Sequence, residues 1–350
     1  MTSMSKPLID KHLKKNKLGL TIRDYEGGMS TLCAGCGHDS VTAALVQAFW
    51  ELSLAPESAA KVSGIGCSSK TTAYFMGQSS GINCVHGRMP SVATGANAVN
   101  GDLHYIGISG DGDSLSIGFG QFAHAMRRNL NMLYIIENNG VYGLTKGQFS
   151  AAADIGTKSK RGIVNEQPPI DPCVQALTLG AGFVGRAFSG DKSQLVPLIQ
   201  AGLMHKGFAV IDVISPCVTF NDHKGSTKSY AHTFKYYHPM IHADFVAHAD
   251  EITGDYSKDG VMDVTLHDGG MLRLRKTGDD YDPRDRGQAI ETLMNPSDEA
   301  AIRTGLLYLN EDMAEMHDAN ALPDTPLNKL PFDTLNPGRA ALASLQKRYR

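Results

Sequence analysis

The chain has 350 residues, of which 42% are hydrophobic and 37 are glycine, and its 33 Lys and Arg are nearly balanced by 36 Asp and Glu. This length leaves room for a substantial core, and the glycine content is typical of a loop-rich α/β enzyme and excludes a coiled coil or a disordered chain. The balanced charge gives no sign of a nucleic acid partner, and no run of about 18 apolar residues suggests a membrane span. We therefore expect a soluble, cytoplasmic protein.

The first hundred residues are predicted to form a surface arm and then alternating elements. Residues 1–30 alternate Lys with apolar residues and end in a loop, which predicts an arm or a short helix lying on a partner. Apolar residues at helical spacing predict a helix that ends at Leu52 and is capped by Asp39 or Ser40. Two short strands and a helix of small residues are expected next, at 61–65, 82–85 and 91–100.

The central unit of the chain has polar groups at the ends of two apolar runs. The first run ends in Gly110-Asp111-Gly112-Asp113, and the second ends in Asn138-Asn139. In open α/β sheets, ligands bind beyond the carboxyl ends of parallel strands, and anions bind at helix N-termini. The glycines let the backbone approach a phosphate, while Asp111 and Asn139 offer the hard oxygen atoms that Mg²⁺ prefers. This unit is therefore predicted to bind a diphosphate through Mg²⁺; an ordinary βαβ unit with glycine turns is the alternative.

The segment after the central unit continues the alternation of helices and strands. Residues 145–170 are predicted to form a long ordered loop over the site. Two helices are expected at 171–179 and 193–205, and two strands at 183–187 and 208–214. Strands that alternate with helices predict an α/β fold with a doubly wound, mainly parallel sheet, in a domain of residues 31–240.

The remaining residues, 241–350, are predicted to form an irregular C-terminal extension. Two alternating runs, 261–266 and 271–275, flank the turn signal His267–Gly270 and predict a hairpin. The tail from Lys276 onward is charged and contains several prolines, with one helix expected near 297–315.

Four of the six cysteines lie in loops or at strand ends that can meet at one edge of the sheet: Cys33, Cys36, Cys67 and Cys217. Four thiolates bind either Zn²⁺ or a [4Fe–4S] cluster, and ligand identity alone does not decide between them. One close pair with two distant single cysteines in a large domain favours a cluster placed for electron transfer. Cys84 lies in an apolar strand and Cys173 begins a helix, and both are predicted to be core thiols. A thioredoxin-like role for the close pair would require a much smaller fold.

The interval between the two polar strand ends is characteristic. Residues 113–137, 25 in all, separate Gly112 from Asn138, and this arrangement resembles the thiamine-diphosphate signature. The resemblance implies a diphosphate-binding domain in which Mg²⁺ is held by Asp111, Asn139 and the main-chain carbonyl of Val141. It also implies that further residues surround the diphosphate: Gly110, Gly112, Asp113 and Thr145.

A broader resemblance covers roughly residues 25–240 and rests on several motifs in a fixed order. These motifs are Cys33-Ala-Gly-Cys36-Gly-His38, Gly64-Ile-Gly-Cys67-Ser-Ser, His86-Gly87-Arg88, Gly110-Asp-Gly-Asp113, Asn138-Asn139-Gly-Val-Tyr-Gly143 and Ser215-Pro-Cys217. Together they resemble the β subunit of 2-oxoacid:ferredoxin oxidoreductases. The resemblance implies that the four cysteines hold one [4Fe–4S] cluster beside thiamine diphosphate. It further implies a reversible oxidative decarboxylation that uses coenzyme A and passes electrons through the cluster to ferredoxin.

Three further residues are candidates for substrate contact. The resemblance suggests that Lys70 meets a substrate carboxylate, and a cation that reaches a second carboxylate would suit 2-oxoglutarate better than pyruvate; a solvated loop lysine is the alternative. His38 and Arg88 could orient the cofactor, the substrate or coenzyme A, or could equally cap a helix or form a structural pair.

The chain is expected to provide only half of an active site. Thiamine enzymes need a second domain that supplies an activating Glu, and residues 241–350 are too short and too irregular to form it. We therefore expect an α subunit in an (αβ)₂ heterotetramer, and an external ferredoxin because six cysteines leave none for a two-cluster ferredoxin module. The alternatives are a pyruvate:ferredoxin oxidoreductase β subunit, half of a non-oxidative thiamine-diphosphate enzyme, and a non-enzymatic nucleotide- or metal-binding scaffold.

Overall fold

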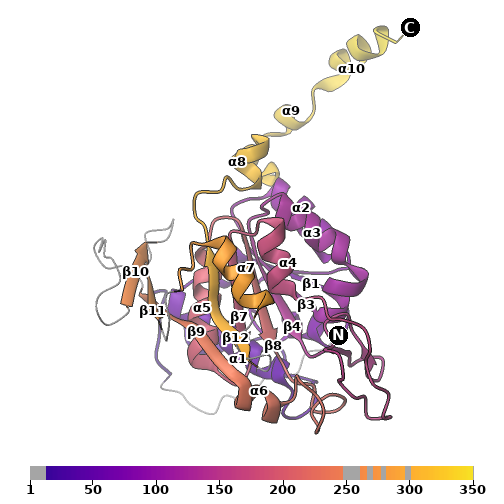
Figure 1. The fold of residues 1–350 in the computed structure, drawn as a ribbon. Coiled ribbons are helices and arrows are strands. Elements are labelled where there is room, and N and C mark those ends of the chain that lie inside the picture. Colours follow the sequence, from indigo (N-terminus) through magenta and orange to yellow (C-terminus); the bar gives the residue numbers. More distant parts are fainter. Residues whose placement is uncertain (1–12, 247–260, 266–270, 277–280, 296–300, 350) are drawn as a thin grey trace.

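The computed structural model describes residues 13–246, 261–265, 271–276, 281–295 and 301–349. Within these residues, a single mixed sheet of ten strands forms the centre of the molecule, in the order β10-β11-β9-β12-β7-β8-β4-β3-β1-β2 (Figure 1). Helices cover both faces of this sheet. The arrangement confirms the predicted α/β fold.

Six neighbouring strands are parallel: β1 (Ala59–Ser63), β2 (Ser80–Asn83), β3 (His104–Gly110), β4 (Met132–Asn138), β7 (Phe183–Phe188) and β8 (Phe208–Ile214). Two neighbouring inner strands, β4 and β8, are buried along their whole length. Such continuous apolar strands are characteristic of parallel sheets that are covered on both faces. The predicted doubly wound, mainly parallel sheet is therefore confirmed.

Two layers of helices sandwich the parallel strands. One layer consists of α1 (Gly37–Leu52) and α5 (Lys192–Met204), which pack against each other. The other layer is a row formed by α2 (Met89–Val99), α3 (Phe119–Arg127), α4 (Pro172–Leu179) and α7 (Arg286–Met294).

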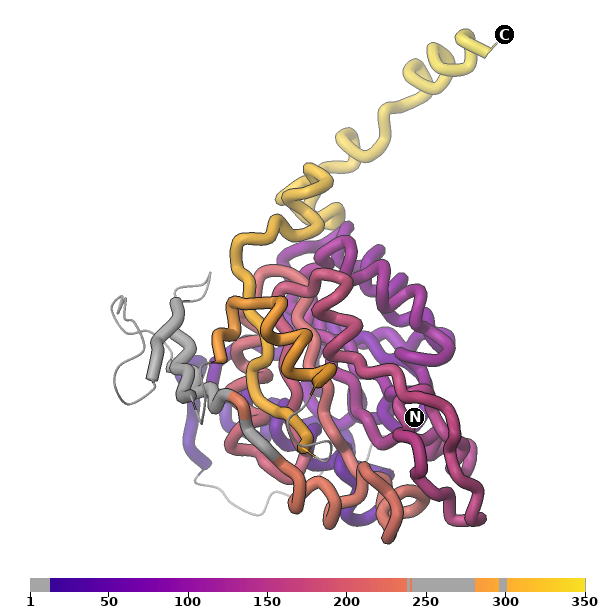
Figure 2. The backbone as a smooth tube through the Cα atoms, in the orientation of Figure 1, coloured from indigo at the N-terminus to yellow at the C-terminus, as the bar shows by residue number. Residues whose placement is uncertain are grey.

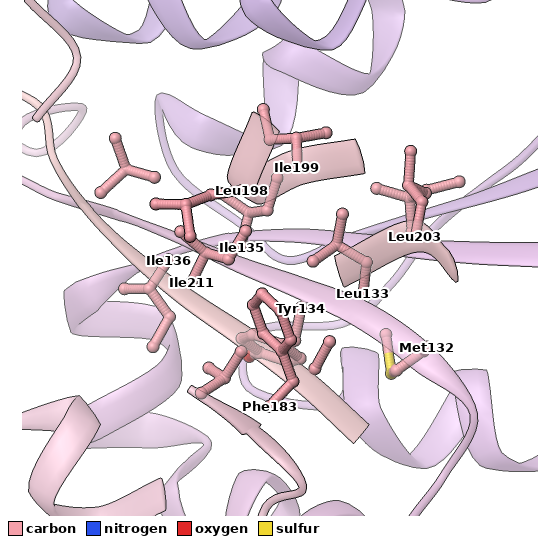
Figure 3. Packing of buried hydrophobic residues seen from close by; sticks show 14 of the residues in the cluster. Met132, Leu133, Tyr134, Ile135, Ile136, Phe183, Leu198, Ile199, Leu203 and Ile211 are labelled. Carbon is pink, nitrogen blue, oxygen red and sulfur yellow. The ribbon is translucent and has the colours of Figure 1, made fainter. Parts of the chain in front are cut away.

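Alternate side chains of β4 reach opposite helical layers, as the two-residue period of a strand requires. Leu133 packs so closely on α5 that a Cβ on Gly202 would lie 2.8 Å from its Cδ1. Tyr134 faces the other layer, with its ring centroid 4.9 Å from that of Phe122 in α3. Figure 3 shows this crowded centre of the core around β4.

The C-terminal part of the sheet is mixed. β12 (Ile302–Leu309) pairs antiparallel with β7, and β9 (Tyr237–Val246) pairs parallel with β12. β10 (Val261–Thr265) and β11 (Met271–Lys276) form an antiparallel pair that extends the sheet from β9. The predicted hairpin is thus confirmed, and its turn residues 266–270 lie outside the described residues.

Two sequence predictions of helices need correction. The expected helix near 297–315 is wrong, because residues 302–309 form β12, which packs between α5 and α7 and covers the edge of β7. Pairing with an open strand edge outweighs the local helical pattern. The first helix begins at Gly37 and not after Asp39 or Ser40, since Cys36 occupies its N-cap position and Gly37 N donates to Pro216 O at 3.2 Å.

The described part of the N-terminal region lies on its own chain. Asn16 Nδ2 donates to Tyr25 Oη at 2.8 Å and to the carbonyl of Trp50 in α1 at 3.1 Å. A 3₁₀ turn, η1 (Ile22–Tyr25), is the only regular element within residues 13–30. The boundaries predicted at residues 30 and 240 stay predictions, and the sheet continues across the second one through β9.

The tail beyond β12 leaves the body of the molecule. It contains α8 (Met316–Asn320), η5 (Leu327–Lys329), α9 (Phe332–Leu335) and α10 (Gly338–Lys347). Figure 2 shows that its last part projects away from the sheet. Among the residues that the structure describes, no helix is long and apolar enough to cross a membrane.

Candidate active site

The order of the strands defines where a ligand would bind. After β1 the chain crosses to β2 at the outer edge of the sheet and then returns to β3 on the other side of β1. In open α/β sheets such a reversal opens a crevice beyond the carboxyl ends of the strands. Two glycine-containing turns, 64–67 and 110–113, lie at this crevice. Residues of both turns line one cavity, together with Asn139 and residues 141–145.

Asp111 joins the two polar strand ends. Its carboxylate is buried and accepts hydrogen bonds from the backbone N–H groups of Gly140 at 3.0 Å and Asn139 at 3.5 Å. Ser150 Oγ also donates to it, so the loop after β4 closes over the turn. The predicted convergence of Gly110–Asp113 with Asn138-Asn139 is therefore observed.

The residues present fit a divalent cation. Burial raises the pKa of Asp111 to about 6, although the bond from Ser150 and the charge of Lys228 oppose this rise. A buried carboxylate of this kind is stabilised in its ionised form when a cation binds. Asn139 and Val141 line the same cavity and offer amide and main-chain oxygens. Within the described residues no three His, Cys, Asp or Glu side chains form a metal site, and the Mg²⁺ set expected here needs only one of them.

The glycines of the 110–113 turn allow other residues to approach closely. A Cβ on Gly112 would lie 2.4 Å from Cε1 of Tyr142, whose hydroxyl donates to Gly112 O at 3.1 Å. A Cβ on Gly110 would lie 3.1 Å from Ser68 Oγ. A short π-helix, η4 (Gly112–Ile117), follows the turn, and such irregular turns are frequent at functional sites.

Asp113 organises the wall of the cavity. Its carboxylate accepts hydrogen bonds from Ser109 Oγ at 2.6 Å and from Gly87 N at 2.8 Å, and it contacts His86 Nδ1. Asp113 therefore fixes the His86-Gly87 loop against the turn. Its predicted contact with a cofactor stays a prediction.

The four candidate cysteines come together beside this cavity. A Cβ on Gly143 would lie 3.5 Å from Cys67 Sγ and 3.6 Å from Cys217 Sγ, and Thr219 Oγ1 donates to Cys33 Sγ at 3.2 Å. Burial raises the pKa of Cys36 to about 12, and Cys217 adds to the rise. Burial also raises the pKa of Cys67 and of Cys217, with nearby thiols contributing to both. The absence of a side chain at Gly143 lets the sulfur atoms of Cys67 and Cys217 approach the same point, and the thiols act on one another's pKa values, so their residue types and proximity fit the ligands of a cluster although they do not form a ready-made metal site in the described structure.

Comparison with known proteins identifies the family. Residues 64–213 match the family "Thiamine pyrophosphate enzyme, C-terminal TPP binding domain". The chain is 40% identical over 211 residues to a 2-oxoacid:ferredoxin oxidoreductase subunit beta of Saccharolobus solfataricus, covering 60% of this chain and 67% of that protein. It is 38% identical to the 2-oxoglutarate synthase subunit KorB of Methanocaldococcus jannaschii over 54% of this chain and 69% of the relative. The chain belongs to the family of 2-oxoacid:ferredoxin oxidoreductase β subunits.

Two further likenesses concern 2-oxoglutarate enzymes. The chain is 38% identical to the 2-oxoglutarate oxidoreductase subunit KorB of Mycobacterium tuberculosis, but the match covers 54% of this chain and only 51% of that protein. A solved 2-oxoglutarate:ferredoxin oxidoreductase from Magnetococcus marinus, with 2-oxoglutarate, coenzyme A and succinyl-CoA bound, matches over 89% of this chain and 91% of its own, with 28% identity and a TM-score of 0.71.

His38 belongs to a group of buried polar side chains in this β subunit. The other members of the group were not predicted as site residues. His38 Nδ1 lies 2.6 Å from Ser215 Oγ and 3.5 Å from Glu137 Oε2, and Thr71 Oγ1 donates to both oxygens of Glu137. Burial lowers the pKa of His38 to about 4 and raises that of Glu137 well above its usual value. His38 and Glu137 both line the cavity. The sequence signal for Glu137 was a lone carboxylate in the otherwise apolar β4.

Of the other candidate residues of the β subunit, Thr145 lines the cavity, whereas Lys70, Lys146 and Arg88 do not. Lys70 is half-buried in η3 (Ser68–Ala73), where its charge opposes the rise that burial causes in the pKa of Cys67. Thr145 lines the cavity and donates to Gln148 Oε1 at 2.6 Å. Lys146 lines a neighbouring groove that also includes Thr145. Arg88 is exposed, occupies the N-cap position of α2 and is not among the lining residues.

Both cysteines outside the cluster set are core residues, as predicted. Cys84 and Cys173 are buried in the hydrophobic core, and Cys173 Sγ lies 3.6 Å from Gly185 O.

Proposed function

We propose that this β subunit combines with an α subunit to catalyse the coenzyme-A-dependent oxidative decarboxylation of a 2-oxoacid, with 2-oxoglutarate as the preferred substrate and ferredoxin as the electron acceptor. One observation carries the proposal: Cys67 lines the same cavity as Asp111 and Asn139, and Cys217 is next to Cys67 across Gly143. An electron-transfer centre and a diphosphate site that share one cavity suit a reaction in which carbon chemistry and electron removal are coupled.

The proposed cofactors are thiamine diphosphate, Mg²⁺ and one [4Fe–4S] cluster. Asp111, Asn139 and the carbonyl of Val141 would hold the metal, and Gly110, Gly112, Asp113 and Thr145 would surround the diphosphate. Cys33, Cys36, Cys67 and Cys217 would hold the cluster. When bound, thiamine diphosphate supplies an electron sink for decarboxylation, and the cluster accepts electrons one at a time.

The chain's own residues would order the region between the two cofactors. Burial lowers the pKa of His38 to about 4 and raises that of Glu137 well above its usual value, because burial disfavours the charged form of each. Thr71 and Ser215 hold the two side chains in place. Buried side chains that are held by hydrogen bonds would exclude water from the reacting groups.

The preference for 2-oxoglutarate is supported by Lys70. This side chain follows Cys67 by one helical turn, with Lys70 N donating to Cys67 O at 3.1 Å, and its charge acts on the Cys67 thiol. A lysine at this place could meet the second carboxylate of 2-oxoglutarate, which pyruvate lacks. The names of the M. jannaschii, M. tuberculosis and M. marinus relatives point to the same substrate.

The need for an α subunit is supported by what this chain leaves open. The cavity has a volume of about 110 Å³, below the roughly 300–1,000 Å³ of a site that encloses a small molecule. All four residues of the edge strand β2 are exposed, and so is the neighbouring Val85 at 75%. An open strand edge with exposed apolar side chains is typical of a surface that a partner covers. We propose an (αβ)₂ heterotetramer in the cytoplasm.

The proposal is tested by producing the chain with a candidate α subunit under anaerobic conditions. The purified complex should contain about four iron atoms per β chain and should reduce ferredoxin only when coenzyme A and a 2-oxoacid are both present. Rates with 2-oxoglutarate should exceed those with pyruvate. A colourless, iron-free complex would refute the oxidoreductase assignment, whereas an active complex that prefers pyruvate would refute only the role given to Lys70.

A further inference from the structure

The segment 217–230, which we call the clasp, contacts both proposed cofactor sites. One of its residues, Asn221, is only 1% exposed. Asn221 N donates to Cys217 O at 2.8 Å, which ties it to the cysteine loop, and Ser226 Oγ donates to Asn221 O at 2.8 Å. Asn221 Nδ2 donates to the main-chain carbonyl of Asn139 at 2.7 Å. One residue thus connects a proposed cluster ligand loop, through its backbone N–H, with a proposed metal ligand loop, through its side-chain amide.

The clasp also holds the other pair of cysteines. Thr219 Oγ1 donates to Cys33 Sγ at 3.2 Å, and Tyr230 Oη donates at 3.1 Å to the carbonyl of Gly35, which lies between Cys33 and Cys36. Both ends of the clasp therefore touch the loop of the close cysteine pair.

On the metal side, the clasp supports the loop that contains Gly140. Lys228 Nζ donates to Asp154 Oδ2 at 3.0 Å, and a Cβ on Gly140 would lie 3.2 Å from Lys228 Cδ and 3.1 Å from Asn221 Nδ2. Gly140 has a φ of +74°, a conformation that side chains other than glycine rarely adopt. Because the space around Gly140 is tight and its φ is positive, the backbone at Gly140 is held in one position against the clasp.

The peptide bond between Asn139 and Gly140 is held at both of its ends. Its carbonyl accepts the hydrogen bond from Asn221, and its N–H donates to Asp111 at 3.0 Å. Because a peptide unit is planar and rigid, a rotation forced at the carbonyl moves the N–H as well. A displacement of the cysteine loop would therefore reach the carboxylate of Asp111 through one rigid group.

We propose that Asn221 is a positioning residue that couples the two cofactor sites, so that a cluster on the cysteines favours binding of Mg²⁺–thiamine diphosphate and the bound diphosphate in turn protects the cluster. This inference rests on the proposed function. Linkage requires the effect to be reciprocal, with the same factor in both directions. The bond to Asn139 is the side-chain bond that a substitution would remove, since Asn221 Oδ1 has no partner among the residues described.

Two variants test the coupling in the αβ complex. Asn221→Asp keeps the shape of the side chain but removes the donor, and Asn221→Ala removes the whole amide. We expect each to weaken the binding of Mg²⁺–thiamine diphosphate by about tenfold, within the range of site-to-site coupling, as measured by anaerobic calorimetry. In the wild-type complex the same ligand should slow the loss of iron to a chelator, and this protection should disappear in both variants.

Asn129→Ala is the matched control. Asn129 is also buried, at 4% exposure, and its Nδ2 donates to the carbonyl of Ala314 at 3.1 Å, but it lies at the opposite edge of the sheet. It should lower thermal stability without changing diphosphate binding or iron release.

The results distinguish this inference from the function it rests on. Wild-type binding and wild-type protection in Asn221→Asp would overturn the coupling alone. If a variant fails to assemble, the coupling is tested in the wild-type complex alone. There, Mg²⁺–thiamine diphosphate that does not slow the loss of iron would overturn the coupling. A wild-type complex that lacks iron, or that binds no thiamine diphosphate, would overturn the proposed function itself.

Discussion

The two edges of the parallel sheet use buried polar side chains in different ways. At the carboxyl edge, Asp111 and Glu137 are buried carboxylates whose pKa values are raised by burial. At the amino edge, the neutral amide of Asn129 donates to Ala314 O at 3.1 Å and accepts from Phe208 N at 2.8 Å. Asn129 is satisfied by its own chain, whereas the charged forms of Asp111 and Glu137 are costly to bury until a ligand binds. This difference marks the carboxyl edge as the functional one.

The cysteines provide the sharpest test of this comparison. Cys67→Ser should abolish the visible absorption of the cluster and ferredoxin reduction, because one ligand at the functional edge is lost. Cys84→Ser, in the core near the same turns, is the matched control and should keep both. Iron content and anaerobic absorption spectra measure the outcome, and equal iron loss in the two variants would contradict the assignment of ligands.

Asp111→Asn should separate function from stability. Loss of the charge should weaken Mg²⁺–thiamine diphosphate binding by about 100-fold, as measured by calorimetry. Because the folded-state pKa of Asp111 is raised from 3.8 to about 6, its contribution to stability is full below pH 3.8 and is lost as the pH rises through 6. The cofactor-free variant should therefore gain melting temperature relative to the wild type above pH 6. A variant that melts lower than the wild type at pH 8 would show that Asp111 is a structural residue.

Lys70→Met tests the substrate contact at the same edge. If Lys70 binds the second carboxylate, the KM for 2-oxoglutarate should rise by about tenfold or more, the value of a lost charge-assisted hydrogen bond, while the kinetics with pyruvate should change little. Steady-state rates with both acids provide the comparison. An equal effect on both substrates would assign Lys70 to the cluster environment instead.

Lys206→Ala should have the smallest effect, because it probes an exposed pair at the amino edge. Lys206 Nζ lies 2.8 Å from Asp318 Oδ2, and both side chains are about half exposed. Exposed ion pairs contribute about 0–1 kcal/mol, so the free energy of unfolding should change by no more than this and activity should not change. Denaturant titration and ferredoxin reduction check the two parts. A clear loss of activity would show that the amino edge also contributes to function.

Much of the fold was predictable from the sequence, because the period of the hydrophobic residues identifies a helix or a strand from neighbouring residues alone. The strand at Phe208–Ile214 was placed within its observed bounds, and the hairpin at 261–276 was recognised from alternation around a turn signal. The strand at Ile302–Leu309 was mistaken for part of a helix, because the reason for its conformation is the open edge of β7, which is distant in sequence. The start of α1 was misplaced for a similar reason, since Pro216 contacts Gly37 there.

The candidate site was also predictable only where residue type and spacing identify it. The residue types and their order sufficed to assemble Asp111, Asn139 and the four cysteines at one sheet edge, because the carboxyl ends of parallel strands meet there. Glu137 and Thr71 were not found, because a single carboxylate in an apolar strand and an isolated threonine have no local pattern that identifies a partner. Their bond joins residues 66 positions apart.

The sequence by itself determined the fold class, the ligand types and the family resemblance, since these depend on periodicity, spacing and residue chemistry. Only the tertiary structure decided how the parts act on one another. It placed Asn221 between Cys217 and Asn139, fixed the peptide of Gly140 between Asn221 and Asp111, and buried His38 against Glu137. Such contacts depend on three-dimensional packing between segments far apart in the chain, and no local pattern specifies them.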